Sequence, residues 1–248
     1  MNLHNYEGVE VIIIDDNSEQ KHLVLLDSGL YQISTNYKII KNTKNRGPSY
    51  CRNIGLAKSK GEFVVFLDSD DRINPDLIFN KINKTNEDVI VNYNAVDWSN
   101  TSIVYDKISL NSLKHRWSSS SSNYNLPHTS CMVLRKSFLV RNKIKFPQNT
   151  RKGEDTVFKF LIMANNPRVT HVFEGGTFFI WNNQDTSLTR IRDRKDQVKL
   201  YLEEIKSGVY LMLYTFKYNN IGFVVPLRRI LNSSKKYLKY KLAIVKRW

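Results

Sequence analysis

Apolar residues in the first part of the chain fall into short continuous runs, and each run is followed by a polar turn. The runs cover residues 9–14, 62–67 and 88–93 and are rich in Val, Ile and Phe. A run that is apolar on both faces is typical of a strand buried in a parallel sheet. The first two runs end abruptly in aspartates, so the sequence predicts acidic side chains at the carboxyl ends of two strands.

Helices are expected between these strands. Pro48 and Pro75 each stand where a helix can begin, because proline is tolerated at the first helical position. The helices are predicted to reach about residues 59 and 84. Strands that alternate with helices of this length indicate an α/β fold with a mostly parallel, Rossmann-like sheet flanked by helices. Ligands of such sheets bind beyond the carboxyl ends of the strands, where both acidic clusters are predicted to lie.

The second half of the chain is less regular. A strand is expected at 129–134 and a short helix at 136–142. The helix predicted at 153–164 has acidic residues in its first turn, where the helix dipole favours them. Two further strands, 169–173 and 177–181, are separated by a turn that contains two glycines, and they are predicted to pair with each other.

Positive charge is concentrated at the C-terminal end. The chain has 38 Lys and Arg against 23 Asp and Glu, a net charge of +15, and ten of the basic residues lie after Glu204, where no acidic residue follows. Apolar residues of the segment 227–248 recur every three or four positions with lysines beside them. This pattern is typical of a helix that lies on an anionic membrane surface. The alternative is a helix docked on the protein with its charges in water.

Composition excludes several classes of protein. Apolar residues make up 41% and aromatic residues 12% of the chain, which excludes a disordered or fibrous protein. Cys51 and Cys131 form neither a disulfide framework nor a zinc-binding pattern, as is usual in a reducing compartment. The first residues do not resemble a signal peptide. We therefore expect a cytoplasmic protein, peripheral at the inner face of the cell membrane if the tail binds there. No nucleic-acid partner is expected, because the charge is confined to one segment.

The aspartates at 68, 70 and 71 form the most informative cluster. One interpretation is a polar turn in which aspartate caps the next helix. The other is a site for a hard divalent cation, since Mg²⁺ takes one or two carboxylates and completes its shell with water and substrate phosphates. Strand alternation would let Asp68 and Asp70 point to the same side. Clustered like charges repel unless a cation compensates them, which favours the metal site.

Several phrases spread over roughly residues 8 to 190 resemble glycosyltransferase family 2. Each phrase alone is weak, but four of them occur in the family's order and spacing. In chain order the phrases are VIIIDDNS at 11–18, NRGPSYCRNIGLA at 45–57, GEFVVFLDSDD at 61–71, KIKFP at 143–147, GEDTVF at 153–158 and SLT at 187–189.

The resemblance implies a GT-A fold and the transfer of a sugar from a nucleotide-diphosphate donor, with inversion at the anomeric carbon. Asp155 would be the general base that deprotonates the acceptor hydroxyl. Its alternative is a helix N-terminal carboxylate with no further role. The resemblance also suggests surface polysaccharide or envelope glycan assembly, with a glycan or a lipid-linked molecule as the acceptor.

The resemblance also assigns the donor side of the site. Asp16 would bind the donor base, and Asp68 would lie near the ribose and the diphosphate. Arg52 would support the donor site, with a solvated surface cation as its alternative. Asp70 and Asp71 would hold Mg²⁺ or Mn²⁺ against the diphosphate, where the ion neutralises charge on the leaving group.

One departure from the family affects the expected activity. Family members normally begin with a strand and a helix that form part of the base pocket, whereas only residues 1–8 precede the phrase that should come second. We therefore predict a catalytic domain at 1–194 that lacks this strand and helix, followed by a basic helical extension at 195–248. An inactive binding or scaffold module is the alternative function. A nucleotidyltransferase is a weaker rival, because no glycine-rich basic phosphate loop is present.

Overall fold

The chain forms two compact units in its computed structural model. The first unit contains Met1–Tyr105, Pro127–Phe146 and Pro167–Asn182, and the second contains Asp106–Leu126, Pro147–Asn166 and Asn183–Trp248. The structure describes residue 3 and residues 6–19, 36–83, 85–97, 102–104, 128–148, 150, 152–172, 175–181, 194–218 and 224–245.

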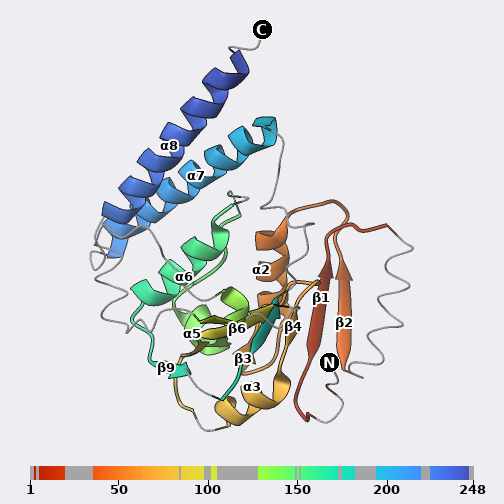
Figure 1. The fold of residues 1–248 in the computed structure, drawn as a ribbon. Coiled ribbons are helices and arrows are strands. Elements are labelled where there is room, and N and C mark those ends of the chain that lie inside the picture. The colour runs from red at the N-terminus through yellow and green to blue at the C-terminus, as the bar shows by residue number, and fades with distance from the viewer. Residues whose placement is uncertain are drawn as a thin grey trace. The chain divides into compact units, whose positions relative to one another are not determined.

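The first unit is an α/β structure, as the sequence predicts. Its strands form a parallel pair and two four-stranded sheets, ordered β1-β2, β4-β10-β6-β7 and β3-β8-β5-β9. The strands and helices are β1 (Val11–Asp15), β2 (Tyr37–Lys41), α2 (Pro48–Lys58), β3 (Phe63–Val64), β4 (Arg72–Ile73), α3 (Pro75–Ile82), β5 (Val89–Asn92), β6 (Asn94–Asp97), β7 (Ser102–Val104), β8 (Met132–Arg135), α5 (Lys136–Arg141), β9 (Val169–Val172) and β10 (Phe179–Trp181) (Figure 1). Three of the described strand pairings are parallel and four are antiparallel, so strand direction is mixed.

Strand β1 is less buried than its sequence indicates. It pairs in parallel with β2, from Val11 opposite Tyr37 to Asp15 opposite Lys41. The apolar residues of β1 are half-buried, and its one buried residue is Asp15. The prediction of a strand covered on both faces is wrong for the described part of the chain, where β2 is the strand's one partner and α2 packs against it.

The core of the first unit is centred on β5. All four of its residues are buried, and it lies between β8 and β9 in one sheet. The hydrophobic cluster around it combines side chains from α3, β5, β8, β9 and the segment before β10, and it consists of Ile78, Ile90, Val133, Val172 and Phe178. Burial of such side chains is the main favourable contribution to folding.

The strands predicted to pair at 169–173 and 177–181 are both formed, but they do not pair with each other. Strand β9 pairs in parallel with β5, whereas β10 pairs with β6 and β4 in another sheet. Gly175 and Gly176 have φ values of 86° and 106° and do turn the chain. The turn carries the chain from one sheet to the other, because each strand finds a partner far away in the sequence.

The second unit contains three described helices, α6 (Glu154–Ala164), α7 (Arg194–Tyr218) and α8 (Val224–Val245). Helices α7 and α8 lie side by side as a hairpin (Figure 1). Gly208 permits their close approach, because a Cβ atom there would lie 2.7 Å from Cγ1 of Ile230. Helix α6 belongs to the same unit as this hairpin. The predicted boundary between a catalytic domain and a C-terminal extension at 194/195 stays a prediction. No helix among the described residues is both long and apolar enough to cross a membrane.

A matched pair of valines tests the assigned core. Val133 in β8 is 1% exposed, whereas Val140 in α5 is 60% exposed. Val133→Ala should lower the free energy of unfolding by about 2 kcal/mol, because it removes buried methyl groups and leaves a cavity. Val140→Ala should change it by no more than about 0.5 kcal/mol. Urea denaturation measures both values, and equal effects would contradict the assigned core.

Candidate functional site

Asp16 follows β1 and holds the turn that starts α2. Its Oδ1 accepts hydrogen bonds from the backbone N–H of Arg46 at 2.8 Å and from Nδ2 of Asn42 at 2.9 Å. Its Oδ2 accepts one from the backbone N–H of Gly47 at 2.7 Å. Gly47 precedes the helix with φ at 83°, a conformation that favours glycine. The carboxylate therefore fixes the entry of the chain into α2.

The charge on Asp16 affects a neighbouring thiol. Burial would raise the pKa of Asp16, but the hydrogen bonds from Asn42, Arg46 and Gly47 outweigh it and lower the pKa below its ordinary value. Burial raises the pKa of Cys51 to about 11, and the negative charge of Asp16 acts in the same direction. Asp16 is therefore ionised and Cys51 is a neutral thiol at physiological pH.

Arg52 ties α2 to the segment that leaves β3. Its Nη2 lies 2.8 Å from Oδ1 of Asp68, and its guanidinium Cζ lies over the ring of Phe146, 5.2 Å from the ring centroid. Phe146 in turn packs edge-on against Phe66 at 5.0 Å between ring centroids. The Arg52 side chain is only 13% exposed, so it is a partly buried ion-pair partner of Asp68 rather than a solvated surface cation.

Asn53 forms a long-range contact that the sequence analysis did not predict. Its Nδ2 donates to the carbonyl of Phe146 at 2.8 Å, and its Oδ1 accepts from the Phe146 N–H at 2.9 Å. These partners are 93 residues apart in the sequence. The sequence signalled the two partners separately, in the α2 phrase and in the phrase at 143–147, and the pair of bonds holds the segment at Phe146 against the helix that carries Arg52.

The acidic cluster lies in a turn. Strand β3 ends at Val64, and the backbone N–H of Asp71 donates to the carbonyl of Asp68 at 3.1 Å. Strand alternation therefore does not orient Asp68 and Asp70, and that part of the prediction is wrong because the strand is shorter than its apolar run. Asp70 is exposed and Asp71 is half-buried.

The turn offers a small set of oxygen ligands. Over the described residues, no group of three or more His, Cys, Asp and Glu side chains could hold a metal ion. Mg²⁺ needs only one or two carboxylates when water and substrate phosphates complete its shell. Asp70 and Asp71 fit that requirement, whereas Asp68 is engaged by Arg52. The residues present therefore fit an ion that is shared with a bound diphosphate.

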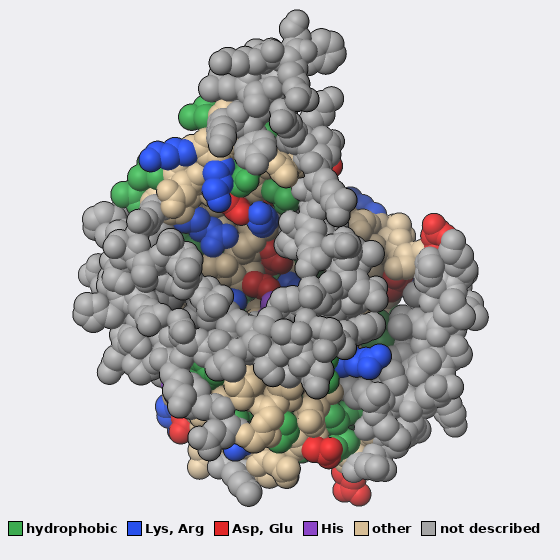
Figure 2. All heavy atoms as spheres, in the orientation of Figure 1, with side chains coloured by type: hydrophobic (Ala, Val, Ile, Leu, Met, Phe, Trp, Pro, Cys, Tyr) green, Lys and Arg blue, Asp and Glu red, His purple; other side chains and the backbone are tan. Residues whose placement is uncertain are grey.

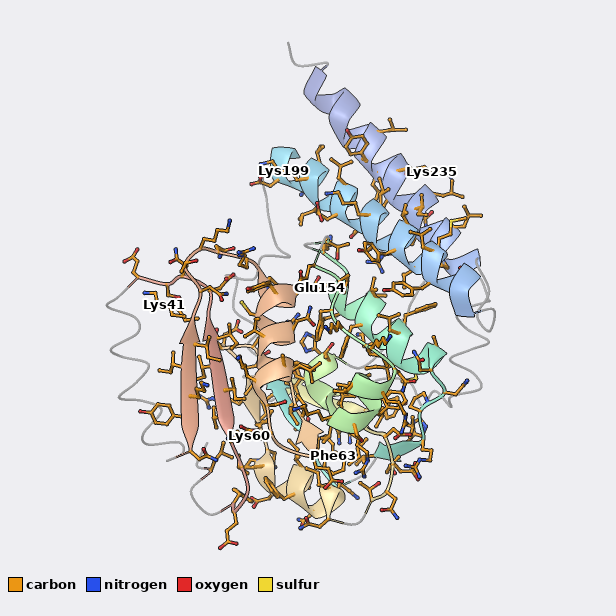
Figure 3. All side chains as sticks on the ribbon, turned by 180° about the vertical axis from the view of Figure 1, so that it is seen from behind. Lys41, Lys60, Phe63, Glu154, Lys199 and Lys235 are labelled. Carbon is orange, nitrogen blue, oxygen red and sulfur yellow. The ribbon has the colours of Figure 1, made fainter. Side chains whose placement is uncertain are left out.

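Asp155 belongs to the second unit, apart in the chain from the donor-side residues. It lies in the first turn of α6, directly after Glu154, and Gly153 before the helix has φ at 82° in the left-handed region. Figure 3 labels Glu154 at the start of this helix. The family phrase predicted at 187–189 lies outside the described residues.

Comparison with known proteins gives concordant results. The model of the family described as "Glycosyl transferase family 2" matches residues 2–141. An "Uncharacterized glycosyltransferase" of Haemophilus influenzae is 26% identical over 242 residues, which is 96% of this chain and 88% of that protein. Poly(ribitol-phosphate) beta-N-acetylglucosaminyltransferase TarP of Staphylococcus aureus is 29% identical over 214 residues, 83% of this chain and 62% of TarP.

A solved structure has the same fold. The crystal structure of S. aureus TarS 1-349 in complex with UDP-GlcNAc superposes with a TM-score of 0.60 and 18% identity, covering 93% of this chain and 72% of that one. The expected GT-A fold is thereby confirmed.

The environment of Cys51 generates a test of the Asp16 contacts. With its pKa raised from 9.0 to about 11, the thiol should be alkylated by iodoacetamide at pH 8 about a hundredfold more slowly than an ordinary cysteine. Asp16→Asn should speed the reaction, because it removes a negative charge that opposes the thiolate. Peptide mass spectrometry measures the rate at residue 51, with the buried Cys131 as an unreactive internal control. Rapid alkylation of the unaltered chain would contradict the assigned environment.

Proposed function

The chain belongs to glycosyl transferase family 2, and on that premise we propose that it is an inverting, metal-dependent transferase of surface polysaccharide or envelope glycan assembly. The observation that best supports the donor-binding part of this proposal is the position of α2 between two acidic turns. Its first turn is held by Asp16, which follows β1, and its middle is held by Asp68, which follows β3. The two acidic turns are thus fixed by one helix.

The donor is a nucleotide-diphosphate sugar, and UDP-GlcNAc is the first candidate. The solved TarS structure holds UDP-GlcNAc, and TarP is named as an N-acetylglucosaminyltransferase. Asp16 accepts a hydrogen bond from the N3–H of the uracil base with a lone pair that its protein contacts leave. Arg52 and Asp68 lie next to the ribose and the diphosphate.

Asp70 and Asp71 hold Mg²⁺ or Mn²⁺ against the diphosphate. The exposure of Asp70 leaves its carboxylate accessible to an ion that arrives with the donor. When bound, the ion neutralises charge that develops on the departing diphosphate. The Arg52–Asp68 ion pair prevents Asp68 from adding a third repulsive charge to the turn.

Asp155 is the general base. Its carboxylate takes the proton of the acceptor hydroxyl while the hydroxyl oxygen bonds to the anomeric carbon. The bond from that carbon to the diphosphate oxygen breaks on the opposite face, so the configuration inverts. The acceptor is a glycan or a lipid-linked molecule, and its hydroxyl supplies the attacking oxygen.

Donor titration distinguishes this function from an inactive binding or scaffold module. Calorimetric titration with UDP-GlcNAc in Mn²⁺ should show binding that weakens at least about tenfold with a chelator and in Asp70→Ala, because the ion bridges protein and diphosphate. Asp76→Ala removes an exposed carboxylate of α3 and should bind donor as the unaltered chain does.

Two results of this titration would contradict the proposal. Equal affinity with and without the chelator would exclude the metal. A folded chain that binds no nucleotide-diphosphate sugar would favour the scaffold module.

We also propose that the α7/α8 hairpin attaches the enzyme to an anionic membrane surface. Part of the predicted apolar stripe of α8 is exposed, since Leu227, Leu231 and Leu238 are 37%, 52% and 55% exposed. Lys235 and Lys236 on the same helix are exposed as well. Figure 2 shows Lys and Arg side chains beside hydrophobic ones over the hairpin. Exposed leucines flanked by lysines suit the boundary between acyl chains and anionic headgroups.

Vesicle binding tests the attachment. The chain should co-sediment with phosphatidylcholine vesicles that contain phosphatidylglycerol, more weakly with phosphatidylcholine alone, and more weakly at high salt, because salt screens the lysines. Leu231→Ser with Leu238→Ser should reduce binding at least about tenfold, since each side chain loses its apolar contact with lipid. Asn232→Ser changes an exposed residue of the same helix and serves as the control. Binding that depends on neither charge nor these leucines would contradict the proposal.

A further inference from the structure

A compact group of charged side chains joins the hairpin to the turn before α6. Glu204 of α7 lies at its centre. The Nζ of Lys152 lies 2.6 Å from Glu204 Oε1, and the hydroxyl of Ser233 in α8 donates to Glu204 Oε2 at 2.8 Å. The Glu204 side chain is 19% exposed and Ser233 is buried. Both carboxylate oxygens thus have a donor from a different segment of the second unit.

Arg229 of α8 fills the other side of the same turn. A Cβ atom built on Gly153 would clash with Arg229 Nη2 and would lie 2.9 Å from the hydroxyl of Ser207. Gly153 also has φ at 82°, so this position needs glycine both for its backbone conformation and for space. The guanidinium therefore lies directly against the residue from which α6 begins.

The charged side chains of this group shift one another's pKa values. Burial would raise the pKa of Glu204, but the hydrogen bonds from Lys152 and Ser233 and the positive charges of Lys152 and Arg229 lower it below its ordinary value. Burial lowers the pKa of Arg229, and the negative charges of Glu204 and Glu154 oppose that effect. Removing one member would leave a poorly solvated charge without its partner, which is a large cost in a protein interior.

The group lies at the start of α6. Lys152 pairs with Glu204 of α7, Gly153 lies against the guanidinium of Arg229 of α8, and Asp155 follows within the first helical turn. Figure 3 labels Glu154, the residue between Gly153 and Asp155, at this end of the helix. A shift of the turn would therefore move the Asp155 carboxylate with it.

We propose that Glu204 and Arg229 are positioning residues that fix the turn carrying Asp155, so that the C-terminal hairpin is part of the catalytic apparatus. This inference rests on the proposed role of Asp155 as the base. The hairpin has separate support, because Gly208 of α7 closely approaches Ile230 of α8 without the charged group. Loss of the charged group should therefore loosen the turn and leave the hairpin folded.

Glu204→Gln and Arg229→Met test the proposal in the full chain. Hydrogen exchange of the amides at 154–157 should become at least about tenfold faster in both variants, because the turn opens more often. The turnover number for UDP release from UDP-GlcNAc, with water as the acceptor, should fall about tenfold or more while KM stays within about twofold, because small misplacements of a base are costly and the donor residues lie elsewhere. Asp196→Asn breaks an exposed ion pair with Lys199 on α7 and should change neither measurement.

The outcomes separate this inference from the proposed function. If Asp155→Asn stops UDP release while Glu204→Gln and Arg229→Met keep normal exchange and turnover, the positioning role is wrong and the proposed base stands. If Asp155→Asn has no effect on UDP release, both the proposed role of Asp155 as the base and the positioning role of Glu204 and Arg229 are wrong. If either test variant fails to fold, Ser233→Ala removes a single hydrogen bond from Glu204, and unchanged exchange at 154–157 in that variant would overturn the proposal.

Discussion

The ion pair between Arg52 and Asp68 is the contact on which the proposed donor site depends. It joins α2 to the segment that follows β3, and loss of Asp68 would leave the charge of the partly buried Arg52 poorly compensated. The next residue, Asn53, fixes Phe146 to the same helix through two hydrogen bonds. Because Asp16 holds the first turn of α2, one helix determines the position of three segments that come from distant parts of the sequence.

Compensation of carboxylate charge is the constraint common to both units. Asp16 is compensated by N–H groups and Asp68 by a guanidinium, whereas Asp70 is left exposed at the same turn, as suits an ion brought by the donor. In the second unit Glu204 is compensated by Lys152 and by the nearby charge of Arg229. The basic C-terminal segment therefore places Arg229 near Glu204 inside the unit and also carries exposed lysines.

The sequence predicts local features well and long-range pairing poorly. Pro48 and Pro75 mark the starts of α2 and α3, because proline suits a first helical turn, and the apolar run at β5 marks the centre of the core. Strand partners depend on contacts between distant residues, so the predicted pairing of β9 with β10 is wrong. The proposed site residues come from the family phrases, whereas the contacts of Glu204 and Asn53 join positions with no local pattern between them.

Inverting transfer with Asp155 as the base is the central claim, and proton NMR of the sugar released from UDP-GlcNAc tests it most directly. The donor sugar is α-linked, so attack by water from the opposite face predicts β-N-acetylglucosamine as the first product, before mutarotation mixes the anomers. The same reaction should be absent in Asp155→Asn. An α product, or an unaltered chain that consumes no nucleotide sugar in the presence of Mn²⁺, would contradict the claim.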